Sequence, residues 1–354
     1  MICFGHCAPH DTEPDGQTAA GSVSGFRIQE TVMRISSIGT PSKVLAAAAF
    51  ILFVRNAAPQ DAVATDAGHF NYSATAPLEV KEVSVQQRGG VSIHDIAYIS
   101  PNGETVPAYL VVPERPGKFA AILWGHWLMP NSPSSSREEF LNEAIALAPA
   151  GVVSLLIDAP QARPGFKPAP NPKLIAQQVT DLRRGVDLLL SRPDVDSKRI
   201  AYVGHSWDAG TGAILDAVDK RIAAFVFMSG PQSNRQYVLY SDSPRMIAAR
   251  KGMDLTKVEQ TMQANAWADP GSYAMHLGPA PALFQYGLQD EEWVPLKDAK
   301  DYFAMSSGPK EVKYYECAHA LNVQARLDRF EFLQQHLGLL SLPAGTMARV
   351  PDTK

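Results

Sequence analysis

A serine, Ser206, stands at the apex of a sharp turn that the sequence predicts between a buried strand and a helix. The stretch YVGHSWDAG runs from an apolar segment through a glycine and a histidine into this serine. It nearly spells G-x-S-x-G, the pattern that exposes a nucleophilic hydroxyl at a strained strand-to-helix turn, but Asp208 replaces the final glycine. A carboxylate there suits the first turn of a helix, where the helix dipole favours negative charge. The near-match alone does not separate a nucleophile from an ordinary turn serine.

Two further residues, Asp290 and His319, complete the set that a serine nucleophile needs. Asp290 follows the apolar segment ALFQYG, and His319 follows the segment EVKYYEC. A serine hydroxyl attacks a carbonyl carbon when an imidazole takes its proton, and a carboxylate holds that imidazole in the right tautomer. Reactive groups gather at the carboxyl ends of parallel strands, and each of the three residues follows a predicted strand. We therefore predict a catalytic triad in the chain order Ser, Asp, His.

The acid of this triad has two candidates, because the segment after the strand reads QDEEWVP. Counting forward from Gly287 selects Asp290, whereas counting back from Val294 selects Glu291. We favour Asp290, because the shorter side chain is the commoner partner of histidine in this arrangement. Glu291 stays the alternative.

Backbone N–H groups must stabilise the negative oxygen that forms when the serine attacks a carbonyl group. Trp207, at the start of the predicted helix, offers one N–H, and His126, in the loop after AILWG, offers the other. Three tryptophans, Trp124, Trp127 and Trp293, are expected to approach the same cleft from the strand ends. We predict that they line the substrate pocket.

Extended and helical segments alternate along the chain from about residue 80. KEVSVQQ, VSIHDIAYIS and GETVPAYLVVP alternate apolar and polar residues and predict antiparallel strands. FAAILWGH and GVVSLLIDAP are continuous apolar runs, which are typical of strands covered on both faces in a parallel sheet. The alternation predicts an α/β fold with a mostly parallel eight-stranded sheet and helices on both faces. We assign this catalytic domain to residues 76–342 and a flexible tail to 343–354.

The segment at about 231–278 is longer than the alternation of strands and helices requires. It is rich in Tyr, Trp and Met, which suits a small helical cap that lines a site with adaptable apolar surface. Such a crowded pocket is expected to accept short acyl or aryl groups and to reject long lipid chains. The alternative is that these aromatic residues only dock a helix pair onto the domain.

Residues 1–64 have the pattern of a leader with a signal peptide. Positive charges precede an apolar run at 44–54, which is too short to span a bilayer, and an A-x-A cleavage site follows at 62–64. We predict that translation begins at Met33 and that the processed protein is exported to the periplasm or secreted, with no stable membrane span. The alternative is an uncleaved N-terminal anchor or a cytosolic helix.

The composition argues against several kinds of partner. Hydrophobic residues make up 45% of the chain and the formal net charge is −4, without the concentrated basic surface that nucleic-acid binding needs. Cys3, His6, Cys7 and His10 lie too close together to wrap around a tetrahedral metal ion, so no metal site is predicted. The expected partner is a small-molecule substrate, and the sequence does not indicate the oligomeric state.

Residues from about 80 to 340 resemble an α/β-hydrolase of the dienelactone hydrolase type, which is in turn similar to acetyl-xylan esterases and prolyl-oligopeptidase-like domains. The resemblance is carried by PAYLVVP, ILWGHW, RPDVDSKRIAYVGHSWDAG, ALFQYGLQDEEWVP and YYECAHALN, in that order. It implies the α/β-hydrolase fold and a hydrolase of carboxylic esters that uses Ser206, Asp290 and His319 without a cofactor. Two alternatives are an exported peptidase-like serine hydrolase and a hydrolase-fold binding protein with weak activity.

Overall fold

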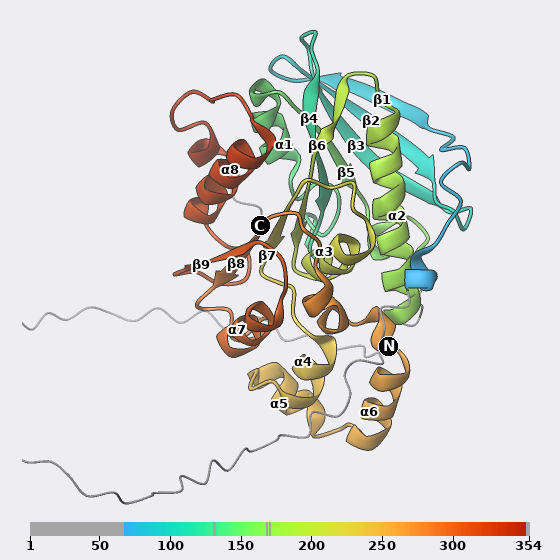
Figure 1. The fold of residues 1–354 in the computed structure, drawn as a ribbon, viewed down its shortest axis with the longest axis vertical. Coiled ribbons are helices and arrows are strands. Elements are labelled where there is room, and N and C mark those ends of the chain that lie inside the picture. The colour runs from blue at the N-terminus through green and yellow to red at the C-terminus, as the bar shows by residue number, and fades with distance from the viewer. Residues whose placement is uncertain (1–66, 130–131, 168, 170, 352–354) are drawn as a thin grey trace, which may run out of the picture. The chain divides into compact units, whose positions relative to one another are not determined.

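The computed structural model describes residues 67–129, 132–167, 169 and 171–351. The predicted leader, with Met33, its apolar run and the cysteine–histidine cluster, lies outside these residues. Strands and helices alternate through most of the described chain (Figure 1). The strands are β1 (Lys81–Gln87), β2 (Val91–Ile99), β3 (Thr105–Pro113), β4 (Phe119–Gly125), β5 (Val152–Ile157), β6 (Val195–His205), β7 (Ala224–Met228), β8 (Ala282–Gly287) and β9 (Lys310–Tyr315). The α-helices are α1 (Leu141–Leu147), α2 (Asn171–Ser191), α3 (Trp207–Val218), α4 (Asn234–Tyr240), α5 (Pro244–Arg250), α6 (Leu255–Ala264), α7 (Leu296–Met305) and α8 (Val323–Leu337).

The described strands form one sheet in the order β1-β2-β3-β5-β4-β6-β7-β8-β9. The pairs β1–β2, β2–β3 and β3–β5 are antiparallel, and all later pairs are parallel. The carboxyl ends of β6, β8 and β9 therefore meet at one edge of the sheet. This edge brings together the segments that carry the predicted triad.

The sheet has nine strands, so the predicted number of eight is wrong. The segment KEVSVQQ, which the sequence predicts as a strand, forms the edge strand β1: every residue of β1 is exposed, and β1 pairs with β2 alone. An exposed edge strand is held by backbone hydrogen bonds and buries little apolar surface.

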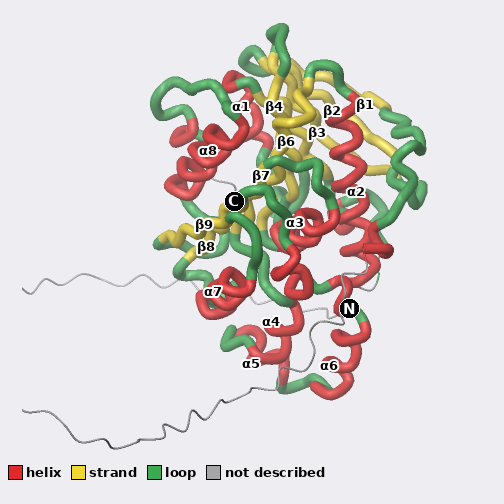
Figure 2. The backbone as a smooth tube through the Cα atoms, viewed as in Figure 1, coloured by secondary structure: helices red, strands yellow, loops and turns green. Residues whose placement is uncertain are grey.

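The two faces of the sheet bury alternate residues of each central strand. Along β4, Ala121 and Leu123 belong to the core cluster that contains residues of α2, α3 and α7, whereas Ile122 and Trp124 belong to the cluster that contains residues of α1 and α8. All seven residues of β4 and all six of β5 are buried, as expected for parallel strands that are covered on both sides. Figure 2 shows helices on both sides of the sheet. The fold is thus the three-layer α/β arrangement that the sequence predicts.

The segment between β7 and β8 is helical, as predicted for a cap. It contains α4, α5 and α6, with α4 next to both of the others (Figure 2), followed by 3-10 helices at Ala266–Ala268 and Pro270–His276. None of the helices in the described ranges is both long and apolar enough to cross a membrane.

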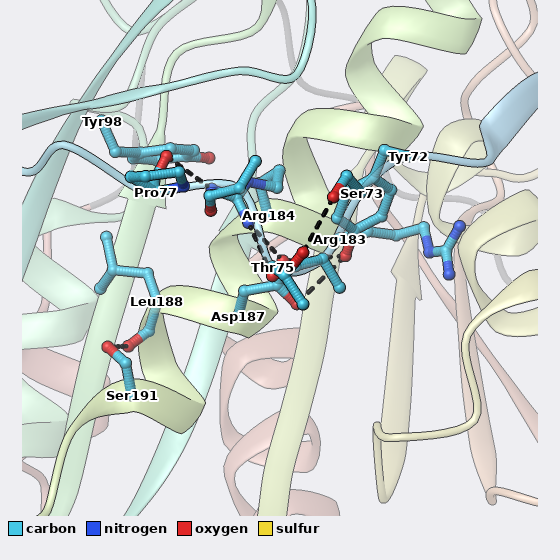
Figure 3. Close-up of polar contacts among 12 residues, drawn as sticks. Tyr72, Ser73, Thr75, Pro77, Tyr98, Arg183, Arg184, Asp187, Leu188 and Ser191 are labelled. Carbon is cyan, nitrogen blue, oxygen red and sulfur yellow. Dashed lines mark hydrogen bonds and ion pairs between the residues drawn. The ribbon is translucent and has the colours of Figure 1, made fainter.

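The folded domain begins before residue 76, the predicted boundary. Residues 67–78, here called the N-terminal segment, run along α2 (Figure 3). Phe70 is fully buried among residues of α2, α3 and the cap, including Tyr273. The fully buried Arg184 of α2 donates to the carbonyl oxygens of Ala76 (2.9 Å) and Pro77 (3.1 Å). Arg184 binds backbone carbonyl oxygens, which every residue has, so the sequence of this segment shows no pattern that predicts the contact.

The tail also differs from the prediction of a flexible segment. Met347 is buried in the core cluster that includes α1 and α8, and a 3-10 helix forms at Met347–Arg349. Arg326 of α8 donates to the carbonyl oxygens of Met347 (3.3 Å) and Val350 (2.6 Å). A single buried methionine and a buried arginine hold a segment that lacks any apolar repeat.

Replacing Arg184 by methionine is expected to lower the free energy of unfolding by about 3 kcal/mol. The change removes the donor to the carbonyl oxygens of Ala76 and Pro77, and leaving buried acceptors without a hydrogen bond is costly. Asp187 loses one of its partners but keeps Arg221 and the Tyr72 hydroxyl. Arg192→Met is the matched control, because Arg192 is a quarter exposed and its ion pair with Asp194 contributes under ~1 kcal/mol. Urea unfolding at pH 7 measures both, and equal losses in the two variants would contradict this role of Arg184.

Candidate active site

Ser206 lies in a strained turn between β6 and α3. Its backbone has φ 56° and ψ −112°, a positive φ that residues other than glycine rarely adopt. Its N–H donates to the carbonyl oxygen of Met228 at 2.7 Å, and Ala209 donates to the carbonyl oxygen of Ser206 at 3.0 Å. The turn therefore holds the hydroxyl at the end of the strand, as in a nucleophile elbow.

The structure brings Ser206, His319 and Asp290 together in one chain of hydrogen bonds. The Oγ of Ser206 lies 2.7 Å from Nε2 of His319, and Nδ1 of His319 lies 2.5 Å from Oδ2 of Asp290. The other oxygen of Asp290 accepts from the N–H of Trp293 at 3.1 Å. Glu291, the alternative acid, is exposed. The geometry therefore selects Asp290 as the partner of His319.

The electrostatic environment suits a neutral imidazole at His319. Burial lowers the pKa of His319 below the usual value for histidine, and the carboxylate of Asp290 opposes this effect. The His319 ring lies between two indoles, with centroid distances of 6.4 Å to Trp127 and 5.9 Å to Trp293. A neutral histidine whose Nδ1–H is held by a carboxylate is free to accept a proton at Nε2.

Of the two predicted oxyanion donors, Trp207 directly follows Ser206 and His126 directly follows β4. Trp207 begins α3, and the first N–H groups of a helix have no partner within the helix. The side chain of His126 is buried: its Nε2 accepts from the N–H of Ala159 at 2.9 Å, and its Nδ1 lies 2.6 Å from the carbonyl oxygen of Trp127. Nδ1 therefore carries the ring proton. The imidazole of His126 holds the loop after β4, while the role of its backbone N–H stays a prediction.

A cavity of about 300 Å³ opens beside Ser206 and His319. Its walls include Trp207 and Trp293 from the catalytic domain and Tyr237 from α4 of the cap. Leu128 lines it from the loop after β4, and Pro270 and Asn234 line it from the cap. The cap thus forms part of the wall of the cavity beside Ser206.

Two of the three tryptophans predicted to line the pocket, Trp124 and Trp127, are not among the described residues that line this cavity. Trp124 is buried in the core and stacks on Phe140 at 4.8 Å, because alternation along β4 directs its side chain to the α1 and α8 face. Trp127 is buried behind the histidines and stacks on His205 at 5.1 Å. Of the three, Trp293 alone is among the lining residues of the cavity.

Asp208, the unusual residue of the elbow, is completely buried. Both of its carboxylate oxygens accept from Nε2 of Gln178 at 3.0 Å, and Oδ1 accepts from the Thr211 hydroxyl at 2.7 Å. A Cβ added to Gly125 would lie 2.7 Å from the Asp208 side chain, so this carboxylate fills the space beside the end of β4. Burial raises the pKa of Asp208 to about 6, against the opposing effects of His126, Thr211 and Gln178.

Sequence reasoning missed Glu139, which is buried and contacts Nδ1 of His205. Glu139 precedes α1 within an ordinary run of polar residues, SSSREEF, so no motif identifies it. His205 occupies a variable position of the elbow pattern. Glu139 and His205 meet only because the segment before α1 packs against the end of β6 in the folded protein.

The buried carboxyl of Asp208 is expected to make stability depend on pH. Its folded-state pKa of about 6 exceeds the unfolded value of ~3.9, so the folded state binds the proton more tightly. The contribution of Asp208 to stability therefore falls as pH rises from about 4 to about 6, by about 3 kcal/mol in total. Asp208→Asn removes this decrease, because asparagine does not titrate.

Urea unfolding of the parent and of Asp208→Asn between pH 4 and pH 8 measures this difference. Asp216→Asn is the comparison variant, because burial raises the pKa of Asp216 to about 6 at a site away from the elbow. Parallel stability curves for the parent and Asp208→Asn would show that the carboxyl is ionised equally in both states.

Comparison with solved structures places the fold among the α/β-hydrolases. The chain superposes on the acetyl xylan esterase from Paenibacillus sp. R4 with a TM-score of 0.60 and 20% identity over 74% of this chain and 90% of that one. Acetyl xylan esterase 1 from Thermoanaerobacterium sp. JW/SL YS485 gives a TM-score of 0.64 and 15% identity over 77% and 92% of the two chains. An α/β-hydrolase from Penicillium sp. sh18 gives 0.50 and 17% over 69% and 98%.

The sequence itself matches no family model and no curated protein. Sequence identities this low show that the fold is shared, but they do not show the activity. The predicted resemblance is confirmed at that level: this chain has the α/β-hydrolase fold, with a mostly parallel sheet and a helical cap segment.

Proposed function

We propose that this protein hydrolyses carboxylic esters through an acyl-enzyme intermediate on Ser206. The observation that carries this proposal is the unbroken hydrogen-bond chain from Ser206 through His319 to Asp290 at the wall of a cavity. Nucleophile, base and orienting acid are thus within hydrogen-bond distance of one another before any substrate binds. Structural likeness to two acetyl xylan esterases supports the same class of reaction.

The chemistry follows from the position of each group. Nε2 of His319 accepts the Ser206 proton while Oγ bonds to the carbonyl carbon of the ester, and Asp290 stabilises the imidazolium. The N–H groups of Trp207 and His126 donate to the oxyanion. The alcohol leaves with the proton from His319. Water, deprotonated by the same histidine, then releases the acid and restores the serine.

The cavity favours short acyl or aryl esters as substrates. At about 300 Å³ it is at the lower end of the range for small-molecule sites, and Trp207, Trp293 and Tyr237 give it aromatic walls. A long acyl chain requires more apolar surface than this volume offers. The described lining residues include no acidic side chain, so the amine-binding acids expected of a peptidase have no counterpart there. This supports an esterase over the peptidase alternative.

The complete hydrogen-bonded set also supports an active enzyme over the alternative of a hydrolase-fold binding protein. Export to the periplasm or secretion belongs to the proposal as well. It rests on the signal-peptide pattern in residues 1–64.

Ser206→Ala and His319→Ala are each expected to reduce kcat on the order of 10⁴-fold or more, because triad residues act as a unit. Asp290→Asn is expected to cost less than either, since the serine and the histidine stay in place. Glu291→Gln is the matched control, because Glu291 adjoins Asp290 but is exposed. Its kcat should stay within about twofold of the parent, as for a surface position.

Hydrolysis of p-nitrophenyl acetate, with mass-spectrometric mapping of a fluorophosphonate adduct, measures these effects. An adduct on a serine other than Ser206, or full activity of Ser206→Ala, would contradict the proposal. A crippled Glu291→Gln beside an active Asp290→Asn would transfer the acid role to Glu291.

The dependence on acyl length tests the proposed substrate class. We expect kcat/KM for p-nitrophenyl esters to be highest with acyl groups of about two to four carbons, because the cavity is small. Tyr237→Ala removes part of the wall and should shift the optimum to longer chains. Tyr240→Ala, on the exposed side of the same helix, should not. A parent enzyme with its highest kcat/KM on chains of eight carbons or more would contradict the short-chain proposal.

A further inference from the structure

A buried acid–histidine pair, Glu139 and His205, lies directly behind the triad and has no part in the mechanism above. The side chains are 3% and 2% exposed. They come from different elements: Glu139 precedes α1, and His205 ends β6 beside Ser206. Burying a carboxylate and an imidazole is costly unless each hydrogen bond is satisfied, so their partners define what they do.

His205 holds the main chain of His319. Its Nδ1 contacts Oε1 of Glu139, and its Nε2 lies 3.0 Å from the carbonyl oxygen of His319. A carbonyl oxygen only accepts, so Nε2 must donate. The hydroxyl of Ser229, which follows β7, donates to the same oxygen. Two donors from neighbouring strand ends thus fix the peptide that carries the triad histidine.

The second carboxylate oxygen of Glu139 reaches the opposite side of the site. Oε2 accepts from the backbone N–H of Trp127 at 2.6 Å, in the loop after β4 that contains the predicted oxyanion donor His126. The Trp127 ring stacks on His205 at 5.1 Å and 18° between planes, which closes the pair from that side. One carboxylate therefore connects the oxyanion loop to the loop of the triad histidine.

We propose that Glu139 and His205 are positioning residues that fix His319 and the oxyanion loop relative to each other. The proposal rests on the function proposed above, since it assigns this pair a role in the reaction at Ser206. Glu139 accepts from Trp127 and from His205, and His205 donates to His319. Both ring nitrogens of His205 thus face oxygen atoms, Nδ1 a carboxylate oxygen of Glu139 and Nε2 the carbonyl oxygen of His319.

Removing the carboxylate tests this role. Glu139→Leu leaves the Trp127 N–H and His205 without their shared acceptor, so kcat is expected to fall about 10²-fold, the size of effect that a displacement of ~1 Å produces. KM should stay within about threefold, because neither residue is among the described lining residues of the cavity. Glu139→Gln should stay within about tenfold of the parent. Its amide oxygen still accepts from Trp127, and its amide N–H₂ donates to a His205 that keeps its proton on Nε2.

His205→Phe keeps a ring stacked on Trp127 but removes both hydrogen bonds, so it should resemble Glu139→Leu. The double variant Glu139→Leu/His205→Phe should be no slower than the slower single variant, because both changes break the same connection. Glu138→Leu is the matched control: the same substitution at an adjacent exposed residue, expected to leave kcat within about twofold.

The measurement is the rate of fluorophosphonate labelling of Ser206, together with kcat per titrated active site. A merely structural role would lower thermal stability and the fraction of active sites, but leave both rates per active site unchanged. That result for Glu139→Leu, with a parent that labels normally, would overturn the positioning role alone. A parent that does not label at Ser206 would contradict the proposed function, and the positioning role would fall with it.

Discussion

The main-chain conformation of Ser206 is the constraint on which the site depends. A non-glycine residue at φ 56° costs of order 1–3 kcal/mol, and it persists only where surrounding contacts over-determine it. Those contacts are present: the Ser206 N–H is bound by the end of β7, and Tyr202 of β6 donates to the carbonyl oxygen of Asp208 at 2.7 Å. In this conformation the Ser206 hydroxyl lies at the carboxyl edge of the sheet. Asp290, in the loop after β8, and His319, in the loop after β9, lie at the same edge.

Three buried carboxylates lie around Ser206, and each accepts hydrogen bonds from more than one residue. Asp290 bonds His319 and the Trp293 N–H, Glu139 bonds His205 and the Trp127 N–H, and Asp208 bonds Gln178 and Thr211. Burying a charged carboxylate without hydrogen-bond donors would cost much of the free energy of folding. With these hydrogen bonds, each carboxylate connects separate segments. Asp290 connects the loop after β8 to His319, and Glu139 connects the segment before α1 to His205 and to the loop after β4. Asp208 connects the elbow to α2. The site is therefore held from several layers of the fold at once.

The cap and the N-terminal segment form a second level of support. The Trp267 ring of the cap stacks on His69 at 3.8 Å, and Phe70 packs edge-on against Trp267 and Tyr273. Pro270, between those two cap residues, lines the cavity. The N-terminal segment thus packs on the part of the cap that lines the cavity beside Ser206, and Arg184 of α2 donates to its carbonyl oxygens.

The sequence by itself determined the fold class, the order of the elements and the prediction of a serine, a histidine and one of two neighbouring acids at one edge of the sheet. Continuous apolar runs define the central strands, and because parallel strands share a carboxyl edge, Ser206, Asp290 and His319 had to converge. The helical character of the segment between β7 and β8 followed from its composition and length.

Tertiary structure alone decided which side chains meet. Asp290 and Glu291 share one turn, and only the approach of the His319 loop distinguishes them. The sequence predicts both Trp124 and Trp293 as pocket residues. The alternation of side chains along β4 nevertheless places Trp124 in the core. Glu139 and His205 lie far apart along the chain, and Asp208 is buried because α2 and β4 close over it. Local periodicity specifies elements and their order, whereas these contacts depend on packing between elements, which no single segment encodes.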